Sequence, residues 1–156
     1  MKYVILGLIF ASICFSGHKM GNRYKEKEKF YYEFKNFLVF LKSEIGFFKK
    51  NLITIFDEFA SENPKFIKLL ENCKNFITSN KKLDLEFLSK QENFELEEFF
   101  RGLGQNDCNF QKEYIEKNLE FFNKKYDESV RLNAKYGVVI KKISILVGIM
   151  VCIILI

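Results

Sequence analysis

The sequence predicts an all-α protein, an antiparallel bundle of about six soluble helices flanked by an N-terminal and a C-terminal transmembrane helix. Two observations predict it. Apolar residues recur at intervals of three and four through the middle of the chain, and an uncharged apolar run lies near each end. No stretch alternates apolar and polar residues as a half-buried strand would. With 156 residues, the chain has room for one domain with a modest core.

The first element is the apolar run YVILGLIFASICFSG at residues 3–17, which contains no charge and is soon followed by Lys19 and Arg23. We expect it to be a retained membrane anchor. A cleaved signal peptide and a lipoprotein signal ending at Cys14 are the alternatives. Neither fits well: no clean small-x-small cleavage site follows, Ile13 is unusual before a lipoprotein cysteine, and the basic cluster lies on the wrong side of the run for export.

The first soluble helix is predicted from Phe30 to Phe48, because its apolar residues form one stripe. That stripe comprises Phe30, Phe34, Phe37, Leu38, Leu41, Ile45 and Phe48. A shorter stripe predicts a second helix over residues 52–59. Asn63 and Pro64 then supply an N-cap and a first-turn proline for a third helix that reaches about residue 77.

Two short helices are predicted after the polar break SNKK at residues 79–82. We expect Asp84 to cap the first, which carries apolar residues at 85–88. We expect Asn93 to cap the second, which carries apolar residues at 94–100.

The last soluble stripe runs through residues 110–134 and continues toward the C-terminal apolar run with no break before Gly137. That run, ISILVGIMVCIILI at residues 143–156, is uncharged and follows Lys141 and Lys142. Both terminal runs are shorter than the roughly 20 residues that cross a bilayer. Flanking residues can make up the difference if the lysine side chains extend toward the headgroups.

The net charge of +5 is confined to the two membrane junctions. The middle of the chain holds all 20 acidic residues and as many basic ones, so a nucleic-acid partner is not expected. The excess comes from Lys2 and from four membrane-flanking residues, Lys19, Arg23, Lys141 and Lys142. By the positive-inside rule, the middle region faces the cytoplasm and both termini face the opposite side. The expected domains are an anchor at 1–20, a cytoplasmic bundle at 24–135 and an anchor at 137–156.

The reactive side chains give no reason to expect an enzyme. His18 is the only histidine, which excludes a histidine-based metal cluster or catalytic triad in the soluble region. No pair of cysteines has the CxxC spacing, so we expect neither a zinc site nor a disulfide framework. The cysteines are Cys14, Cys73, Cys108 and Cys152. We therefore expect no catalytic residue, cofactor, metal or small-molecule substrate.

An acidic cluster follows the predicted break at residues 79–82. It comprises Glu92, Glu95, Glu97 and Glu98. Glutamates early in a helix are favoured by the helix dipole, so a solvated face is the preferred interpretation. A docking patch for a protein partner is the alternative, and a carboxylate metal centre without histidines would be unusual.

The sequence RGLGQNDCNFQ at 101–111 is the clearest corner between helices. We expect Gly102 and Gly104 to adopt the left-handed backbone that ends a helix. Asn106 or Asp107 would cap the next helix, and Gln111 would lie one turn into it. As a phosphate-binding loop the segment is poor, because it lacks the Gly-Lys-Ser/Thr ending.

This corner, with the two anchors and their basic junctions, resembles the stage III sporulation protein AB family over essentially the whole chain. The corner residues that carry the resemblance are Leu103, Gly104, Asn106, Asp107 and Gln111. Ser43-Glu44-Ile45 corresponds to a short acidic-Ile motif of the family, which makes Glu44 a further candidate for docking. The chain departs from the family at Asn51-Leu52, where Pro-Leu is usual, and in having no tryptophan.

The resemblance implies a non-enzymatic role in spore development. Family members belong to a channel between mother cell and forespore, and their soluble domain is similar to the cytoplasmic domain of the type II secretion platform protein F. By that analogy the chain would lie in the outer forespore membrane and display its bundle to the mother-cell cytoplasm. It would link a secretion-type ATPase to the other channel subunits. The alternative is a generic two-anchor helical adaptor unrelated to sporulation.

Overall fold

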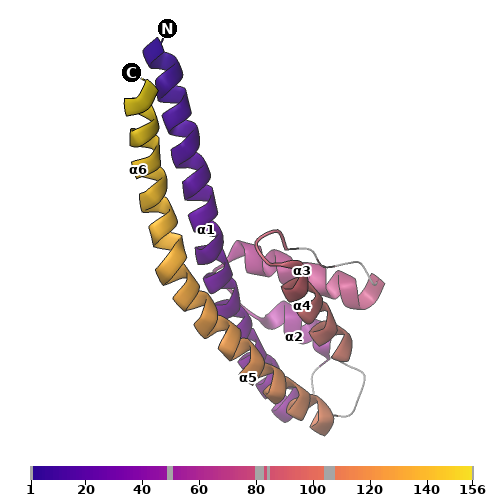
Figure 1. Cartoon of the computed structure of the whole chain (residues 1–156). Coiled ribbons are helices and arrows are strands. Elements are labelled where there is room, and N and C mark those ends of the chain that lie inside the picture. The colour runs from indigo at the N-terminus through magenta and orange to yellow at the C-terminus, as the bar shows by residue number, and fades with distance from the viewer. Residues whose placement is uncertain (1, 49–50, 80–82, 84, 104–107, 156) are drawn as a thin grey trace. The chain divides into compact units, whose positions relative to one another are not determined.

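The computed structural model describes residues 2–48, 51–79, 83, 85–103 and 108–155. Over these residues all regular structure is helical and no strand is present, which confirms the all-α class (Figure 1). The elements are α1 (Lys2–Ser43), η1 (Glu44–Phe48), α2 (Leu52–Glu58), α3 (Pro64–Ser79), α4 (Lys90–Gly102), α5 (Cys108–Leu132), η2 (Asn133–Gly137) and α6 (Val138–Leu155), where η marks a π-helical segment.

The chain divides into two compact units, which are described separately. The core unit is Phe30–Tyr126, and the anchor unit combines Met1–Lys29 with Asp127–Ile156. Residues 24–29 and 127–135, which the sequence pattern placed with the cytoplasmic bundle, therefore group with the anchors. Residues 24–29 belong to α1, and residues 127–135 belong to α5 and η2, which lead into α6.

Several helices begin where the sequence pattern places them. Asn63 caps α3 as predicted, because its Oδ1 accepts a hydrogen bond of 3.0 Å from the backbone N–H of Lys65. Asn51 caps α2 in the same way and accepts a bond of 3.1 Å from the N–H of Ile53. The helix predicted from Phe30 begins much earlier, because α1 is a single helix of 42 residues that also contains the N-terminal apolar run.

The prediction for residues 84–93 is wrong in two respects. Residues 86–88 form a turn rather than a helix, and Asp84 lies outside the described residues. Asn93 is not an N-cap: α4 begins earlier, and Ser89 caps it. The Ser89 side chain accepts a hydrogen bond from the N–H of Glu92 while the Glu92 carboxylate accepts one from the N–H of Ser89, which is a capping box.

Asn93 has another structural role, which explains why it lies inside α4. Its Oδ1 accepts a hydrogen bond of 2.9 Å from the N–H of Leu85, and its Nδ2 donates to the carbonyl of Leu85 at 3.2 Å. A single amide thus satisfies both backbone groups of a residue in the turn before α4. The short segment predicted as a helix is held in an irregular conformation by this pair of bonds.

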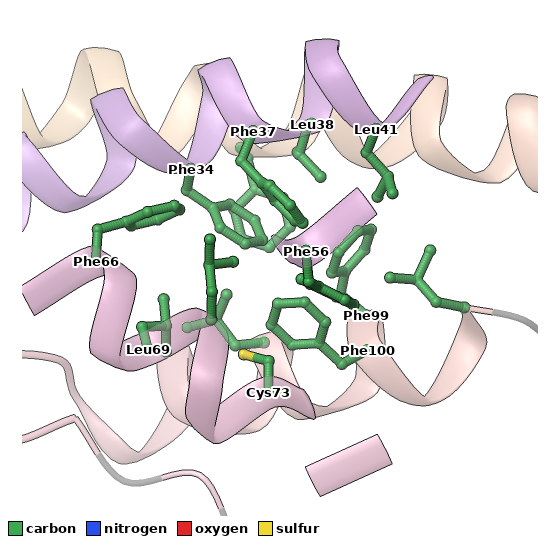
Figure 2. Packing of buried hydrophobic residues seen from close by; sticks show 14 of the residues in the cluster. Phe34, Phe37, Leu38, Leu41, Phe56, Phe66, Leu69, Cys73, Phe99 and Phe100 are labelled. Carbon is green, nitrogen blue, oxygen red and sulfur yellow. The ribbon is translucent and has the colours of Figure 1, made fainter. Parts of the chain in front are cut away.

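The core unit is built around phenylalanine side chains contributed by α1, α2, α3, α4 and α5 (Figure 2). The largest fully buried aromatic side chains are Tyr31, Phe34, Phe37, Phe66, Phe99, Phe100 and Phe122. Edge-to-face ring pairs predominate among them, and the ring centroids of Phe34 and Phe122 are 4.6 Å apart. Burial of these rings is the main source of stability of the unit.

The anchor unit is an antiparallel pair of helices in which the N-terminal half of α1 lies against η2 and α6 (Figure 1). Glycines bring the two backbones close together. A Cβ atom on Gly17 would lie 2.2 Å from Cβ of Ser144, and one on Gly21 would lie 2.7 Å from the carbonyl oxygen of Gly137. Small residues at such positions permit close packing of membrane helices.

Candidate functional site

The anchor unit contains the apolar parts of two helices that are compatible with a place in a membrane. Two helices, Val4–Gly46 and Asn109–Ile154, are long and apolar enough to cross a membrane by length and composition. Only 11% of the most apolar 18-residue segment of each helix is buried, whereas the core helix of a soluble protein is mostly buried. Large apolar side chains such as Phe15 and Leu146 are exposed, as a lipid-facing surface requires.

The helix pairing brings Lys19, Lys141 and Lys142 to one level of the hairpin, and Arg23 lies about one helical turn further along α1. Gly17 packs against Ser144, and Gly21 packs against both Gly137 and Lys141, so residues 18–20 of one helix lie opposite residues 138–143 of the other. We call these four neighbouring residues the basic collar. It comprises Lys19, Arg23, Lys141 and Lys142. Lys141 is half-buried and donates a hydrogen bond of 2.7 Å to Oδ1 of Asn22, whereas the other three side chains are exposed.

Polar and aromatic pairs continue the interface beyond the collar, away from the apolar ends. The rings of Tyr24 and Tyr136 lie with centroids 6.1 Å apart. Nδ2 of Asn133 donates a hydrogen bond of 2.6 Å to Oε2 of Glu28. Tyrosines are common at the headgroup level of membrane proteins, so their place directly beyond the collar is consistent with a membrane boundary there.

Three cysteines have side chains that the structure describes. Cys73 is fully buried in the core unit, and burial raises the pKa of its thiol well above the usual range. Cys14 and Cys152 are half-buried free thiols in the anchor unit. No group of three or more metal-ligating side chains occurs among the residues that the structure describes. Because thiolate is the reactive form, Cys73 will be alkylated only when the core opens, so its labelling rate measures opening.

The acidic cluster, for which a solvated face is the preferred prediction and a docking patch the alternative, does not form one exposed surface. Glu92 is buried, with 6% of its surface exposed, and its carboxylate lies inside the core unit. Oε1 accepts a hydrogen bond of 3.0 Å from the hydroxyl of Tyr31, and Oε2 accepts bonds from Ser89. Its role is to fix the start of α4 against α1. Glu44, the other candidate, is also buried, with 8% exposed.

The three remaining glutamates differ in how far they are engaged. Glu95 forms an ion pair with Lys125 of α5, with 3.0 Å between Oε2 and Nζ. Oε1 of Glu97 accepts a hydrogen bond of 2.9 Å from the N–H of Leu83. Glu98 is exposed. Of the acidic residues proposed for docking, Glu98 therefore presents its carboxylate to solvent most openly.

The buried contact between Tyr31 and Glu92 gives a testable prediction. Replacing Tyr31 with phenylalanine leaves the ring in place but removes a hydrogen bond to a buried carboxylate. We expect the free energy of opening of the core unit to fall by about 1–3 kcal/mol. The rate of Cys73 alkylation in the full chain should rise at least about fivefold, measured by peptide mass spectrometry where closing is faster than labelling. Tyr32→Phe is the matched control, because Tyr32 is exposed, and equal effects of the two variants would contradict the prediction.

The corner between α4 and α5 is described only in part, since Gly104, Asn106 and Asp107 lie outside the described residues. The left-handed conformation predicted for Gly102 is wrong: Gly102 is the last helical residue of α4 and has no positive φ. Leu103 follows as the C-cap, with φ −73° and ψ 136°, and its side chain is buried in the core. Gln111 lies half-buried in the first turn of α5.

Lack of space explains the glycine at position 102. A Cβ atom there would lie 2.4 Å from the hydroxyl oxygen of Tyr114. That hydroxyl lies 3.3 Å from the carbonyl oxygens of Glu98 and Phe99 and donates to the C-terminal end of α4. Burial raises the pKa of Tyr114, and the charge of Glu98 adds to the effect, so the donor proton is retained. Gly102 thus lets a tyrosine of α5 satisfy the end of α4.

Gly102→Ala is therefore expected to destabilise the core unit by about 1–3 kcal/mol, because the added methyl group displaces the Tyr114 ring. The effect should be much smaller in a Tyr114→Ala background, where the space is open. Cys73 alkylation of the single and double variants completes a double-mutant cycle. If Gly102→Ala costs the same in both backgrounds, steric conflict with Tyr114 is not the cause.

The sequence analysis missed the residues that build the anchor interface. Gly17 and Gly21 form a G-x-x-x-G pattern, which is a known signal of close membrane-helix packing, but their position at the end of the apolar run concealed it. From the sequence, Gly137 is predicted only to interrupt the last soluble helix. It lies instead inside the helical segment η2, buried against Gly21.

Comparison with known proteins identifies one family. The model of the family described as stage III sporulation protein AB matches residues 2–156. No curated protein matches the chain, and no solved structure matches it.

Proposed function

Because the chain belongs to the stage III sporulation protein AB family, and is thus a sporulation-related protein, we propose that it is a platform component of a channel between mother cell and forespore. In this role it is not an enzyme. It is a membrane protein that links a cytoplasmic secretion-type ATPase to other channel subunits. The observation that carries the proposal is the family match, which covers both apolar helices and the core unit together.

The placement of charge supports the proposed orientation. The basic collar lies on the side of each apolar run that leads to the core unit, and the positive-inside rule assigns that side to the cytoplasm. The core unit would face the mother-cell cytoplasm from the outer forespore membrane, with both termini across the membrane. A reporter that is active only in the cytoplasm, inserted between Ser79 and Asn80, should be active, and an inactive reporter in a folded fusion would reject this topology.

The architecture of the core unit supports a docking role better than a catalytic one. Its interior is occupied by phenylalanine rings, which favours a rigid helical scaffold, and we propose an antiparallel bundle similar to the type II secretion platform protein F domain. Glu98, which is exposed on α4, is the acidic residue best placed to contact the ATPase. Co-purification of the full chain with the cognate ATPase from mild detergent tests this link. Failure under conditions that keep the complex intact would count against it.

Deletion of the chromosomal copy tests the function itself. We expect sporulation to stop after engulfment is complete, and complementation by the native sequence to restore it. Normal spore formation by the deletion strain would reject the channel role. It would favour instead a two-anchor helical adaptor, whose partner could be sought by crosslinking in membranes.

A further inference from the structure

We propose that the basic collar is a binding site for the headgroups of anionic phospholipids. The collar is assembled from both ends of the chain, since Lys19 and Arg23 belong to α1 while Lys141 and Lys142 belong to α6. The proposal rests on the membrane insertion proposed above and goes beyond it, because insertion alone requires no preference for one headgroup.

Charge is the first argument. The collar faces no carboxylate of its own level: residues 1–25 and 129–156 contain no aspartate or glutamate. The nearest acidic residues along the two helices are Glu26, Glu28, Asp127 and Glu128. Of these, Glu28 already accepts a hydrogen bond from Asn133. The positive charge of the collar is therefore available to an external anion.

Position of the side chains is the second argument. The Asn22 amide oxygen holds the Lys141 ammonium group at 2.7 Å, which fixes the amine at the collar while leaving two of its three N–H groups for another acceptor. Lys19 and Arg23 are four residues apart on one helix, so both side chains lie on the same face. That face is turned away from α6, because Gly17 and Gly21, which contact α6, each lie two residues earlier, about 200° around the helix. The collar therefore presents its charge to lipid headgroups on more than one side of the hairpin.

The surroundings of the collar favour a lipid over an acidic protein segment. On one side lie exposed apolar residues, which a pair of acyl chains would cover. They include Phe15, Met20, Ile143 and Leu146. On the other side lies the Tyr24–Tyr136 pair, of a type common at the headgroup layer. A ligand with an anionic head and apolar tails matches both, whereas an acidic peptide matches only the charge.

Lipid titration of the full chain in an uncharged detergent tests the proposal. Native mass spectrometry would compare phosphatidylglycerol, phosphatidylcholine and inorganic phosphate. A basic residue near an anionic surface changes a binding constant by about fivefold, so we expect at least that preference for phosphatidylglycerol over phosphatidylcholine. It should weaken in high salt. No preference between the two lipids, or displacement of the lipid by an equal concentration of phosphate or acidic peptide, would overturn the proposal.

Matched variants separate the collar from net charge. The first variant replaces Lys19, Arg23, Lys141 and Lys142 with glutamine. The control replaces four exposed lysines of the core unit with glutamine, namely Lys68, Lys90, Lys112 and Lys117. Each removes four positive charges. The collar variant should lose the preference and the control should keep it; equal behaviour of the two would overturn the proposal.

A single substitution and an insertion assay complete the test. Asn22→Ala releases Lys141 without changing any charge and is expected to lower the preference about twofold to fivefold; an unchanged preference would overturn the assigned position of Lys141. Flotation of each variant with phosphatidylcholine vesicles measures insertion independently. A chain that floats but does not select anionic lipid would refute the lipid site alone, whereas a native chain that does not float would refute the proposed membrane insertion.

Discussion

Replacing Phe34 with alanine is expected to destabilise the core unit by about 3–5 kcal/mol, the typical cost of removing a buried phenylalanine ring. Phe34 has no exposed surface and lies where α1, α3, α4 and α5 meet (Figure 2). Its ring pairs with those of Phe30, Phe37, Phe66, Phe99, Phe100 and Phe122. The variant loses the apolar burial and leaves a cavity that these rings cannot all move to fill.

Alkylation of Cys73 in the full chain measures this loss. A fall of that size should raise the labelling rate at least about 100-fold under the conditions given for Tyr31→Phe. Phe94→Ala is the matched control, because Phe94 lies on α4 with 52% of its surface exposed and should change stability by less than about 0.5 kcal/mol. Similar labelling of the two variants would show that the core does not depend on Phe34 as the packing indicates.

Gly21→Val is expected to separate the two helices of the anchor unit. The added Cβ would lie 2.7 Å from the carbonyl oxygen of Gly137, and a backbone atom cannot move aside as a side chain can. Valine would also meet the stem of Lys141, so the hydrogen bond between Lys141 and Asn22 should be lost. The expected result is a longer and broader distance between spin labels at positions 15 and 146, which are exposed on the two helices.

Gly7→Val provides the control for this change. It makes the same substitution in the same helix, but a Cβ on Gly7 would have nothing within 4 Å. Both variants carry the same change in helix propensity, so any difference between them reflects the packing of the pair. The labels are placed in a background whose native cysteines are replaced by alanine. An unchanged distance in the Gly21 variant would mean that the close approach at Gly137 does not hold the helices together.

The helices of the core unit could be predicted because each buries one apolar stripe, and the spacing of that stripe is local information. The beginnings of helices were less certain. Ser89 and Asn93 are both good N-caps by type, and the choice between them depends on Leu85, whose backbone needs the Asn93 amide. The Ser-x-x-Glu spacing from Ser89 to Glu92 was visible in the sequence and favours the correct start. The role of Asn93 could not be predicted in this way, because it depends on a tertiary contact with the backbone of Leu85.

The candidate site was less predictable than the fold, because its residues depend on partners far away in the sequence. Glu92 looks solvated by position, yet Tyr31, 61 residues earlier, binds it in the interior. The sequence suggests that Gly102 is a glycine because it adopts a left-handed backbone, yet the actual reason is that the Tyr114 side chain leaves no space for a Cβ atom. The basic residues were found from the distribution of charge along the sequence, but that they lie close together along the hairpin follows only from the contacts of Gly17 and Gly21.

The π-helical segment η2 fixes the rotational phase of the C-terminal helix. A π-helical turn contains one residue more than an α-helical turn, so the side chains after Gly137 point in directions that an unbroken α-helix from Asp127 would not give them. Loss of one residue between Asn133 and Gly137 would turn everything that follows by about 100°. Ser144 and Gly148 would then leave Gly17 and Phe10, and bulky side chains would take their places. We therefore expect the chain to tolerate substitutions on the exposed side of α6 far better than a change in length at η2.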